Sequence, residues 1–189
     1  DGEASANVLC QVDANSALTA TTQSGCNQPN AVWGDSTAGA YLYTTDTSNN
    51  RVLKFDVTAI TDGENAVSVL GQPDFVTATA TTSQTGLSAP HGVYVYDDDT
   101  LYVADSTNNR VMIFDVTAIT DGENAVDGLG HLDGDGEMDF TLGSASNFAV
   151  YTFDEAHDIA IDTVNHRLFA ADPEHNRVLV FDLNSSNEL

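Results

Sequence analysis

Short apolar runs recur along the chain, and many of them alternate partly between hydrophobic and polar residues. In the middle of the sequence they read "AVSVLG", "HGVYVY", "TLYVAD" and "RVMIFD". Runs of this length, rich in Val, Ile, Tyr and Phe, are typical of half-buried β-strands. Turn-forming stretches such as "YDDDT" and "DSTNN" separate them. The pattern predicts four short antiparallel strands in this part of the chain.

The same pattern occurs three times. Arg51, Arg110 and Arg177 align the copies, and "YLYTTD", "TLYVAD" and "RLFAAD" then fall at one position. The twelve-residue stretch "DVTAITDGENAV" occurs twice without change. We therefore predict one region, 1–189, made of units at about 1–61, 62–120 and 121–189. Four antiparallel strands in each repeat indicate an all-β protein built of β-propeller blades.

An aspartate and an arginine recur around the turn that follows the third run of each unit. The pairs are Asp46 with Arg51, Asp105 with Arg110, and Asp172 with Arg177. An aspartate here can accept hydrogen bonds from turn amides, and the intervening Asn suits a positive φ. The arginine can pair with that aspartate or with an adjacent blade. Since three of the chain's four arginines occupy this position, we predict a structural role for them.

The stretch "LYVADSTNNRVMIFD", preceded by "PHGVYV", resembles the NHL repeat family, and "VLGQPDF" resembles its longer bacterial variety. The resemblance covers all three units and is clearest in the second. The first departs with "YLYTTD" and with Cys10 where Gly71 stands, and the third departs at "HLDGDGEMDF". The resemblance implies a propeller, usually of about six blades, but not one activity, since members include binding modules, sensor domains, lyases and hydrolases.

The two ends of the repeat pattern predict incomplete blades. Three blades are fewer than the roughly four to eight of a closed propeller. In this family, a strand like "ASANVLC" forms the outer edge of the preceding blade, and "RVLVFD" would lack that outer strand. One expectation is therefore donation of the N-terminal strand to a second copy, which gives a ring or an open filament. The other is that the chain is half of a longer protein.

Amino-acid composition limits the classes of molecule that the protein is suited to bind. The chain has 29 acidic and 5 basic residues, a net charge of −24, and 41% hydrophobic residues, enough for a core. This charge is unsuited to nucleic acid and to anionic membranes, and it suits cations, high salt or a need for solubility. No apolar run is long enough for a transmembrane helix, so we expect no membrane insertion.

Two cysteines, Cys10 and Cys26, are the only ones in the chain. A disulfide between them is the simplest interpretation, and it favours an extracellular or cell-surface location. Two buried thiols are the alternative.

The stretch "HLDGDGEMD" resembles the calcium loops of extracellular proteins. Asp133, Asp135 and Asp139 match the alternating carboxylates, and Glu137 lies between them. Carboxylates spaced in this way converge on a hard cation, while Gly allows the sharp bend. His131 stands at the first position, where it is a poor Ca²⁺ ligand. The sequence has two interpretations here, a Ca²⁺ site and a solvated acidic turn.

His91 and His157 share one repeat position. In the NHL family that position begins the innermost strand near the central channel, and histidines there ligate metal in the family's lyases. A catalytic zinc site usually has three protein ligands, so a polar lining of the channel mouth is the alternative.

Other catalytic motifs are missing. The sequence contains no GxSxG, P-loop or GxGxxG pattern. The threonine-rich stretch at 76–86 and the "NSS" pattern at Asn184 are candidate glycan attachment sites. We predict a non-catalytic extracellular structural or binding protein that self-assembles. The alternatives are a metal-dependent, lyase-like enzyme with its site at the channel and a ligand-binding sensor domain of a longer chain.

Overall fold

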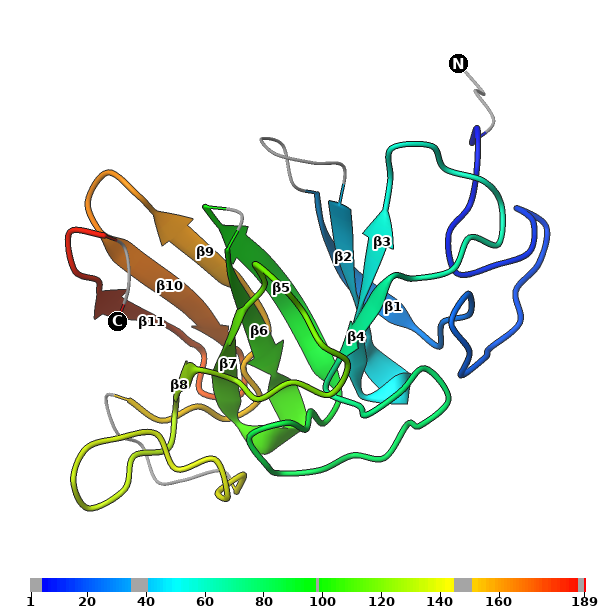
Figure 1. Ribbon diagram of the computed structural model, residues 1–189. Helices are drawn as coiled ribbons and strands as arrows, with labels where there is room; N and C mark the ends of the chain where they lie inside the picture. Colours follow the sequence, from blue (N-terminus) through cyan, green and yellow to red (C-terminus); the bar gives the residue numbers. More distant parts are fainter. Residues whose placement is uncertain (1–4, 35–40, 98, 145–150, 187–188) are drawn as a thin grey trace.

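Three antiparallel sheets make up the protein in the computed structural model (Figure 1), which describes residues 5–34, 41–97, 99–144, 151–186 and 189. The first sheet has the order β1-β2-β3-β4, the second β5-β6-β7-β8 and the third β9-β10-β11. The strands are β1 (Pro29–Gly34), β2 (Tyr41–Asp46), β3 (Arg51–Asp56), β4 (Ser68–Leu70), β5 (Pro90–Tyr96), β6 (Thr100–Asp105), β7 (Arg110–Asp115), β8 (Asp127–Leu129), β9 (Ile159–Asp162), β10 (Arg167–Asp172) and β11 (Arg177–Asp182).

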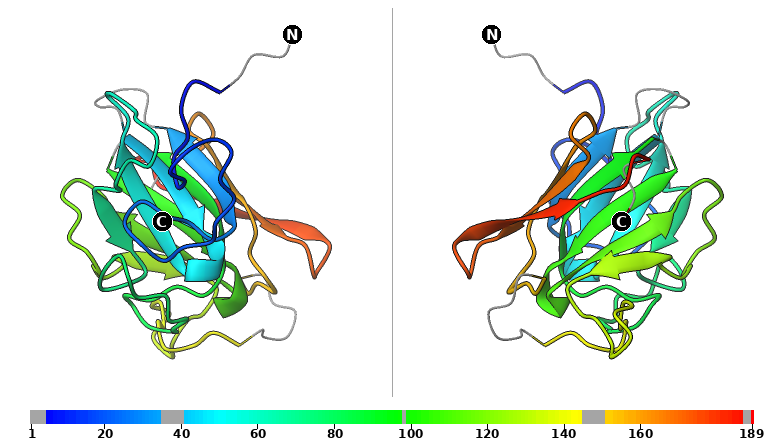
Figure 2. Two further views of the ribbon diagram at one scale, coloured as in Figure 1. Left: turned by 90° about the vertical axis from the view of Figure 1, so that its right-hand side faces the viewer. Right: turned by 90° about the vertical axis from the view of Figure 1, so that its left-hand side faces the viewer.

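The sheets lie side by side like propeller blades. The first strands of neighbouring sheets are adjacent, β1 beside β5 and β5 beside β9. Figure 2 shows β10 and β11 projecting to one side of the other two sheets. This arrangement confirms the prediction of an all-β fold of β-propeller type. Two short 3₁₀ turns, η1 (Thr47–Asn49) and η2 (Ser106–Asn108), are the helical elements of the described residues, and neither is long enough to cross a membrane.

The outer strand of each complete sheet comes from the following part of the chain. In the first sheet β4 pairs with β3 and places Leu70 opposite Val52, and in the second β8 pairs with β7 and places Leu129 opposite Val111. Two sheets therefore have the four strands predicted. The third has three within the described residues, with β11 at its edge, in line with the expectation that "RVLVFD" lacks an outer strand.

The N-terminal run "ASANVLC" was expected to be a strand as well, and this prediction is wrong for its described part. Residues 5–10 form no strand. A strand exists only where a neighbour satisfies its backbone N–H and C=O groups. The equivalent segment β4 pairs with β3, whereas residues 5–10 lie beside no such strand within the part of the chain that the structure describes.

The core lies between the sheets. Tyr43, Leu70 and Phe114 belong to a buried cluster between the first and second sheets, and Tyr102 and Leu168 belong to one between the second and third. A smaller cluster joins the first sheet to the N-terminal segment and contains Cys10, Cys26, Leu53, Phe55 and Val69. Each sheet therefore depends on its neighbours for burial of its faces.

The outer side of the third sheet departs from this pattern. Val52 in β3 and Val111 in β7 are 1% and 0% exposed, because the next sheet covers them. Val178, at the same position in β11, is 60% exposed, and Val180 is 53% exposed. The third sheet thus has an apolar face turned to solvent beside its open edge.

Candidate functional site

The recurring Asp–Arg pairs are in contact in all three sheets. The Nε of Arg51 lies 2.7 Å from Asp46, that of Arg110 lies 2.8 Å from Asp105, and that of Arg177 lies 2.7 Å from Asp172. The first two pairs are fully buried, while the Arg177 side chain is 25% exposed. Burial raises the pKa of Asp105, and the Arg110 guanidinium opposes that shift.

The arginines also connect successive units. Arg110 donates to the carbonyls of Ser83 and Gly86 in the loop before its own sheet, and to the carbonyl of Phe140 beyond β8. Arg51 makes the same set of contacts, with Phe75 as the residue beyond β4. Satisfied hydrogen bonds on every side of a buried guanidinium indicate a structural group. These contacts agree with the structural role predicted for the pairs.

The asparagines before these arginines adopt left-handed backbone conformations. Asn50, Asn109 and Asn176 have φ values of 54°, 55° and 52°. The Asn109 side chain donates to the carbonyl of Gly143 and accepts the N–H of Glu155. The repeated "NNR" therefore combines a tight turn with a contact between units.

The first strands of the sheets bring the two predicted histidines together. His91 lies in β5 and His157 just precedes β9, and their ring centroids are 4.2 Å apart in an edge-to-face arrangement. The Oε2 of Glu155 lies 3.8 Å from His157 Nε2. Burial lowers the pKa of His91, the nearby His157 lowers it further, and Glu155 opposes both effects. The described residues contain no group of three or more His, Cys, Asp or Glu side chains able to hold a metal ion.

An aromatic pair on the first strands of two sheets was not predicted from the sequence. Trp33 in β1 and Tyr94 in β5 lie with ring centroids 4.3 Å apart. Burial raises the pKa of the Tyr94 phenol. The signal was available, because Trp33 and Tyr94 occupy the same repeat position in neighbouring first strands. Strand β5 therefore carries two rings, His91 and Tyr94, that each contact a ring from a neighbouring unit.

The acidic loop uses its carboxylates internally. The Oδ1 of Asp133 accepts the backbone N–H groups of Asp135 and Glu137. The Oδ1 of Asp139 accepts the N–H and the hydroxyl of Thr141, and these hydrogen bonds lower the pKa of Asp139. The arrangement is that of an acidic turn, and Ca²⁺ binding by this loop stays a prediction.

His131, at the head of that loop, has a buried side chain, while its backbone carbonyl accepts the N–H of Asp139. Its Nε2 lies 3.1 Å from the carbonyl of Asn108, and burial lowers its pKa. In the second unit Gln72 has the same place and donates to the carbonyl of Asn50.

The two cysteines form a disulfide, with Cα atoms 5.0 Å apart. Cys10 stands where the second unit has Gly71, and Cys26 stands where it has Leu87. A Cβ built on Gly71 would lie 2.6 Å from Leu87 Cδ1, so those two residues also pack directly together. The disulfide therefore replaces a buried contact of the repeat with a covalent bond.

Comparison with known proteins agrees with this architecture. The family model of the NHL repeat matches residues 87–114, which run from the end of the threonine-rich loop through β5 and β6 into β7. No curated protein matches the chain. The matched repeat contains Asp105, Arg110 and the turn between them, the features that recur in the other two sheets. The chain therefore contains an NHL repeat at residues 87–114 and has an all-β fold of β-propeller type.

Proposed function

We propose that the protein is a non-catalytic extracellular interaction module that assembles with copies of itself by strand donation. The observation that carries the proposal is the third sheet, whose edge strand β11 and exposed Val178 and Val180 stand where the other sheets have a neighbour. NHL repeats are generally non-catalytic binding scaffolds that mediate contacts between proteins. An exposed apolar strand at a sheet edge is a template for pairing with another chain.

The N-terminal segment is the proposed donor, because the second unit binds it with the same contacts that the third unit makes to the outer strand β4. The N–H of Val8 donates to Asp62 at 2.8 Å, just as the N–H of Val69 in β4 donates to Asp121 at 3.0 Å. Gly63 lies against Val12 in the same way that Gly122 lies against Pro73. Residues 7–9 thus have the anchor of an outer strand, yet they pair with no strand among the described residues.

The repeat also fixes the register of the proposed pairing. In the first sheet Val52 faces Leu70 and Leu53 faces Val69, and the second sheet repeats this register. Transferred to β11, the same register places Leu9 of a second copy opposite Val178 and Val8 opposite Leu179. The donated strand would complete the third sheet, and the first sheet of that copy would cover Val178 and Val180.

Such a contact joins two different surfaces of the protein, so each copy in a pair still has one surface free to bind a further copy. Head-to-tail contacts close into a ring when the rotation allows it and otherwise give a filament. Three sheets from each of two copies make a six-bladed ring, within the range of known propellers. The net charge of −24 makes copies repel one another, so assembly should strengthen as salt screens that repulsion.

Light scattering coupled to size-exclusion chromatography tests the proposal across protein concentration and salt, with electron microscopy to separate rings from filaments. The variant Val178→Asp/Val180→Asp should abolish assembly, because it places charge on the uncovered face. The matched control is Val164→Asp, at a turn residue that is 82% exposed. A monomer under all conditions would refute strand donation, and so would assembly that persists in the double variant.

A second candidate function rests on the contact between His91 and His157. A metal-dependent, lyase-like enzyme would use these rings as ligands near the propeller axis. Two imidazoles fall short of the three protein ligands usual for catalytic zinc. Metal analysis decides the matter: stoichiometric Zn²⁺ that disappears in His91→Ala would support the enzyme, and its absence from the purified protein would count against it.

A further inference from the structure

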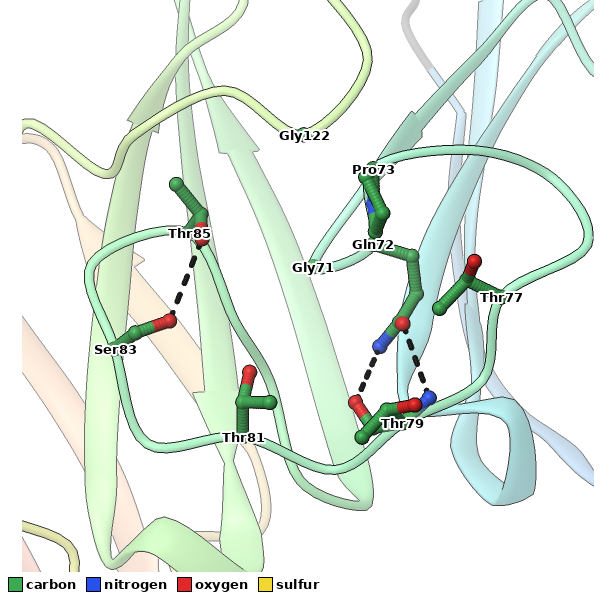
Figure 3. Close-up of a pocket in the computed structure, with 9 residues that line it drawn as sticks. All are labelled: Gly71, Gln72, Pro73, Thr77, Thr79, Thr81, Ser83, Thr85 and Gly122. Atoms are coloured by element: carbon green, nitrogen blue, oxygen red, sulfur yellow. Dashed lines mark hydrogen bonds between the residues drawn. The ribbon is translucent and has the colours of Figure 1, made fainter.

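A cavity between the first and second sheets is separate from both surfaces described so far. The threonine-rich loop that follows β4 closes one side of it, and Gly71, Gln72, Pro73 and Gly122 close the other (Figure 3). Its volume is about 330 Å³. Cavities that hold small molecules measure roughly 300–1,000 Å³, so this one has the size for a compact ligand.

Hydroxyl groups occur at every second position of the loop and line the cavity. The residues are Thr77, Thr79, Thr81, Ser83 and Thr85. The repeat does not require two of them, because the first unit has Leu18 where the second has Thr79 and Ala20 where it has Thr81. The fold therefore tolerates apolar side chains at these two positions, and only the second unit has hydroxyl groups at all five, since the first has them at Ser16, Thr22 and Ser24.

The residues that line the cavity are uncharged, and hydrogen bonds fix the position of the loop. Residues 76–89 contain no charged side chain, although the chain carries a net charge of −24. The amide of Gln72 fixes the loop, since its Nε2 donates to the carbonyls of Thr79 and Asn50 and its Oε1 accepts the N–H of Thr79. The cavity is thus preformed, which reduces the entropy lost on binding.

We propose that this cavity binds a neutral polyhydroxylated ligand, namely a sugar ring. Threonine and serine hydroxyls both donate and accept hydrogen bonds, which matches the hydroxyl groups of a saccharide. Pro73 and the threonine methyl groups offer apolar surface for the C–H groups of the ring. A charged ligand would gain no ionic partner from the wall. The same sugar ring is presented by a free monosaccharide and by the end of a glycan.

The test is an NMR titration of the ¹⁵N-labelled protein with glucose, galactose, mannose and N-acetylglucosamine. At least one sugar should shift the amide signals of Gly71, Gln72, Gly122 and the loop at 77–85 in a saturable way, with a Kd of roughly 1 mM or below. Glycerol serves as the control for a general co-solute effect. If a sugar binds, a methyl glycoside and a short oligosaccharide ending in it separate the free sugar from a glycan end.

Variants connect the binding to the hydroxyl row. Thr79→Val/Thr81→Val/Thr85→Val should weaken binding by about tenfold or more, because it removes three hydroxyl groups that hydrogen-bond the ligand. Thr79→Val alone changes an exposed side chain and provides a milder variant should the triple one unfold. Thr19→Val, in the equivalent loop of the first unit, should bind as the unaltered protein does. Linear shifts with every sugar would overturn the proposal, as would saturable binding that the triple variant keeps.

The titration is repeated in the Val178→Asp/Val180→Asp background. Sugar binding should be unchanged there, because the cavity and β11 lie on different sheets. Loss of binding in that background would instead show that the cavity needs assembly, which contradicts a site contained within one copy.

Discussion

Replacement of Arg110 by leucine tests whether the recurring arginines contribute to the stability of the fold. Arg110 is fully buried, contacts Asp105, and donates to the carbonyls of Ser83, Gly86 and Phe140. Its loss leaves Asp105 as a buried carboxylate without its cation. Removal of one partner from a buried ion pair costs about 3–5 kcal/mol, so the free energy of unfolding should fall by that amount.

Two other arginines provide matched controls of increasing exposure. Arg177→Leu breaks the equivalent pair where the arginine is 25% exposed, and solvent screening should limit the loss to roughly 1–2 kcal/mol. Arg167 is 54% exposed and lies 3.7 Å from Asp182, so Arg167→Leu should cost about 0–1 kcal/mol. Urea unfolding followed by circular dichroism measures all three. The reasoning fails if Arg110→Leu costs no more than Arg167→Leu.

The pH dependence of the Arg110→Leu variant gives an independent check. Burial already raises the pKa of Asp105, and without the arginine nothing cationic opposes that shift. A carboxyl whose pKa is raised by folding takes up a proton more readily in the folded state, so stability increases as pH falls through the folded pKa. The deficit of the variant relative to the unaltered protein should therefore shrink between neutral and mildly acidic pH. A deficit that grows on acidification would contradict this account.

Three further predictions follow from individual contacts. Loss of the disulfide in Cys10→Ala/Cys26→Ala should lower the free energy of unfolding by about 3 kcal/mol. The variant Cys10→Gly/Cys26→Leu installs the pair found at Gly71 and Leu87, so it should lose measurably less in the same urea assay. Equal losses would refute the equivalence of the two pairs. The Thr58 and Thr117 hydroxyls lower the pKa values of Asp56 and Asp115, so Thr58→Val/Thr117→Val should raise both pKa values in an NMR titration. In the unaltered protein, the stability that these carboxylates provide should be lost as pH falls from their usual pKa through the lowered one. Unmoved pKa values in the variant would contradict the assignment. Addition of Ca²⁺ should raise the melting temperature of the unaltered protein but not that of Asp133→Asn/Asp135→Asn if the acidic loop holds the ion, and no rise in either protein would count against the site.

Local pattern was sufficient to predict most of the fold. The period-two runs and the turn-formers between them predict strands such as β5 to β7, because alternation and turn chemistry act over only a few residues. The repeat alignment predicted which aspartates and arginines pair, since equivalent residues occupy equivalent places. The same alignment brought His91 and His157 into one region, and the structure puts their rings in contact.

Features that depend on contacts between sheets were harder to predict. Residues 5–10 carry a strand pattern, yet they form none, because a strand needs a neighbour that sequence pattern cannot supply. The Trp33–Tyr94 pair and the cavity lined by the threonine loop arise where two sheets meet. His131 resembled the start of a calcium loop, but its place in the repeat, shared with Gln72, buries it.

The hydrogen bonds from Arg51 to Phe75 and from Arg110 to Phe140 have a consequence for how the chain unfolds. Each of the first two blades is thus tied to a residue of the following unit, so stability is transmitted by nearest-neighbour coupling, as in a one-dimensional array of repeats. The middle blade has a neighbour on both sides, and its β6 and β7 should exchange their amide hydrogens most slowly. The blade of β9 to β11 should unfold first, and unfolding should then proceed blade by blade towards the N-terminus.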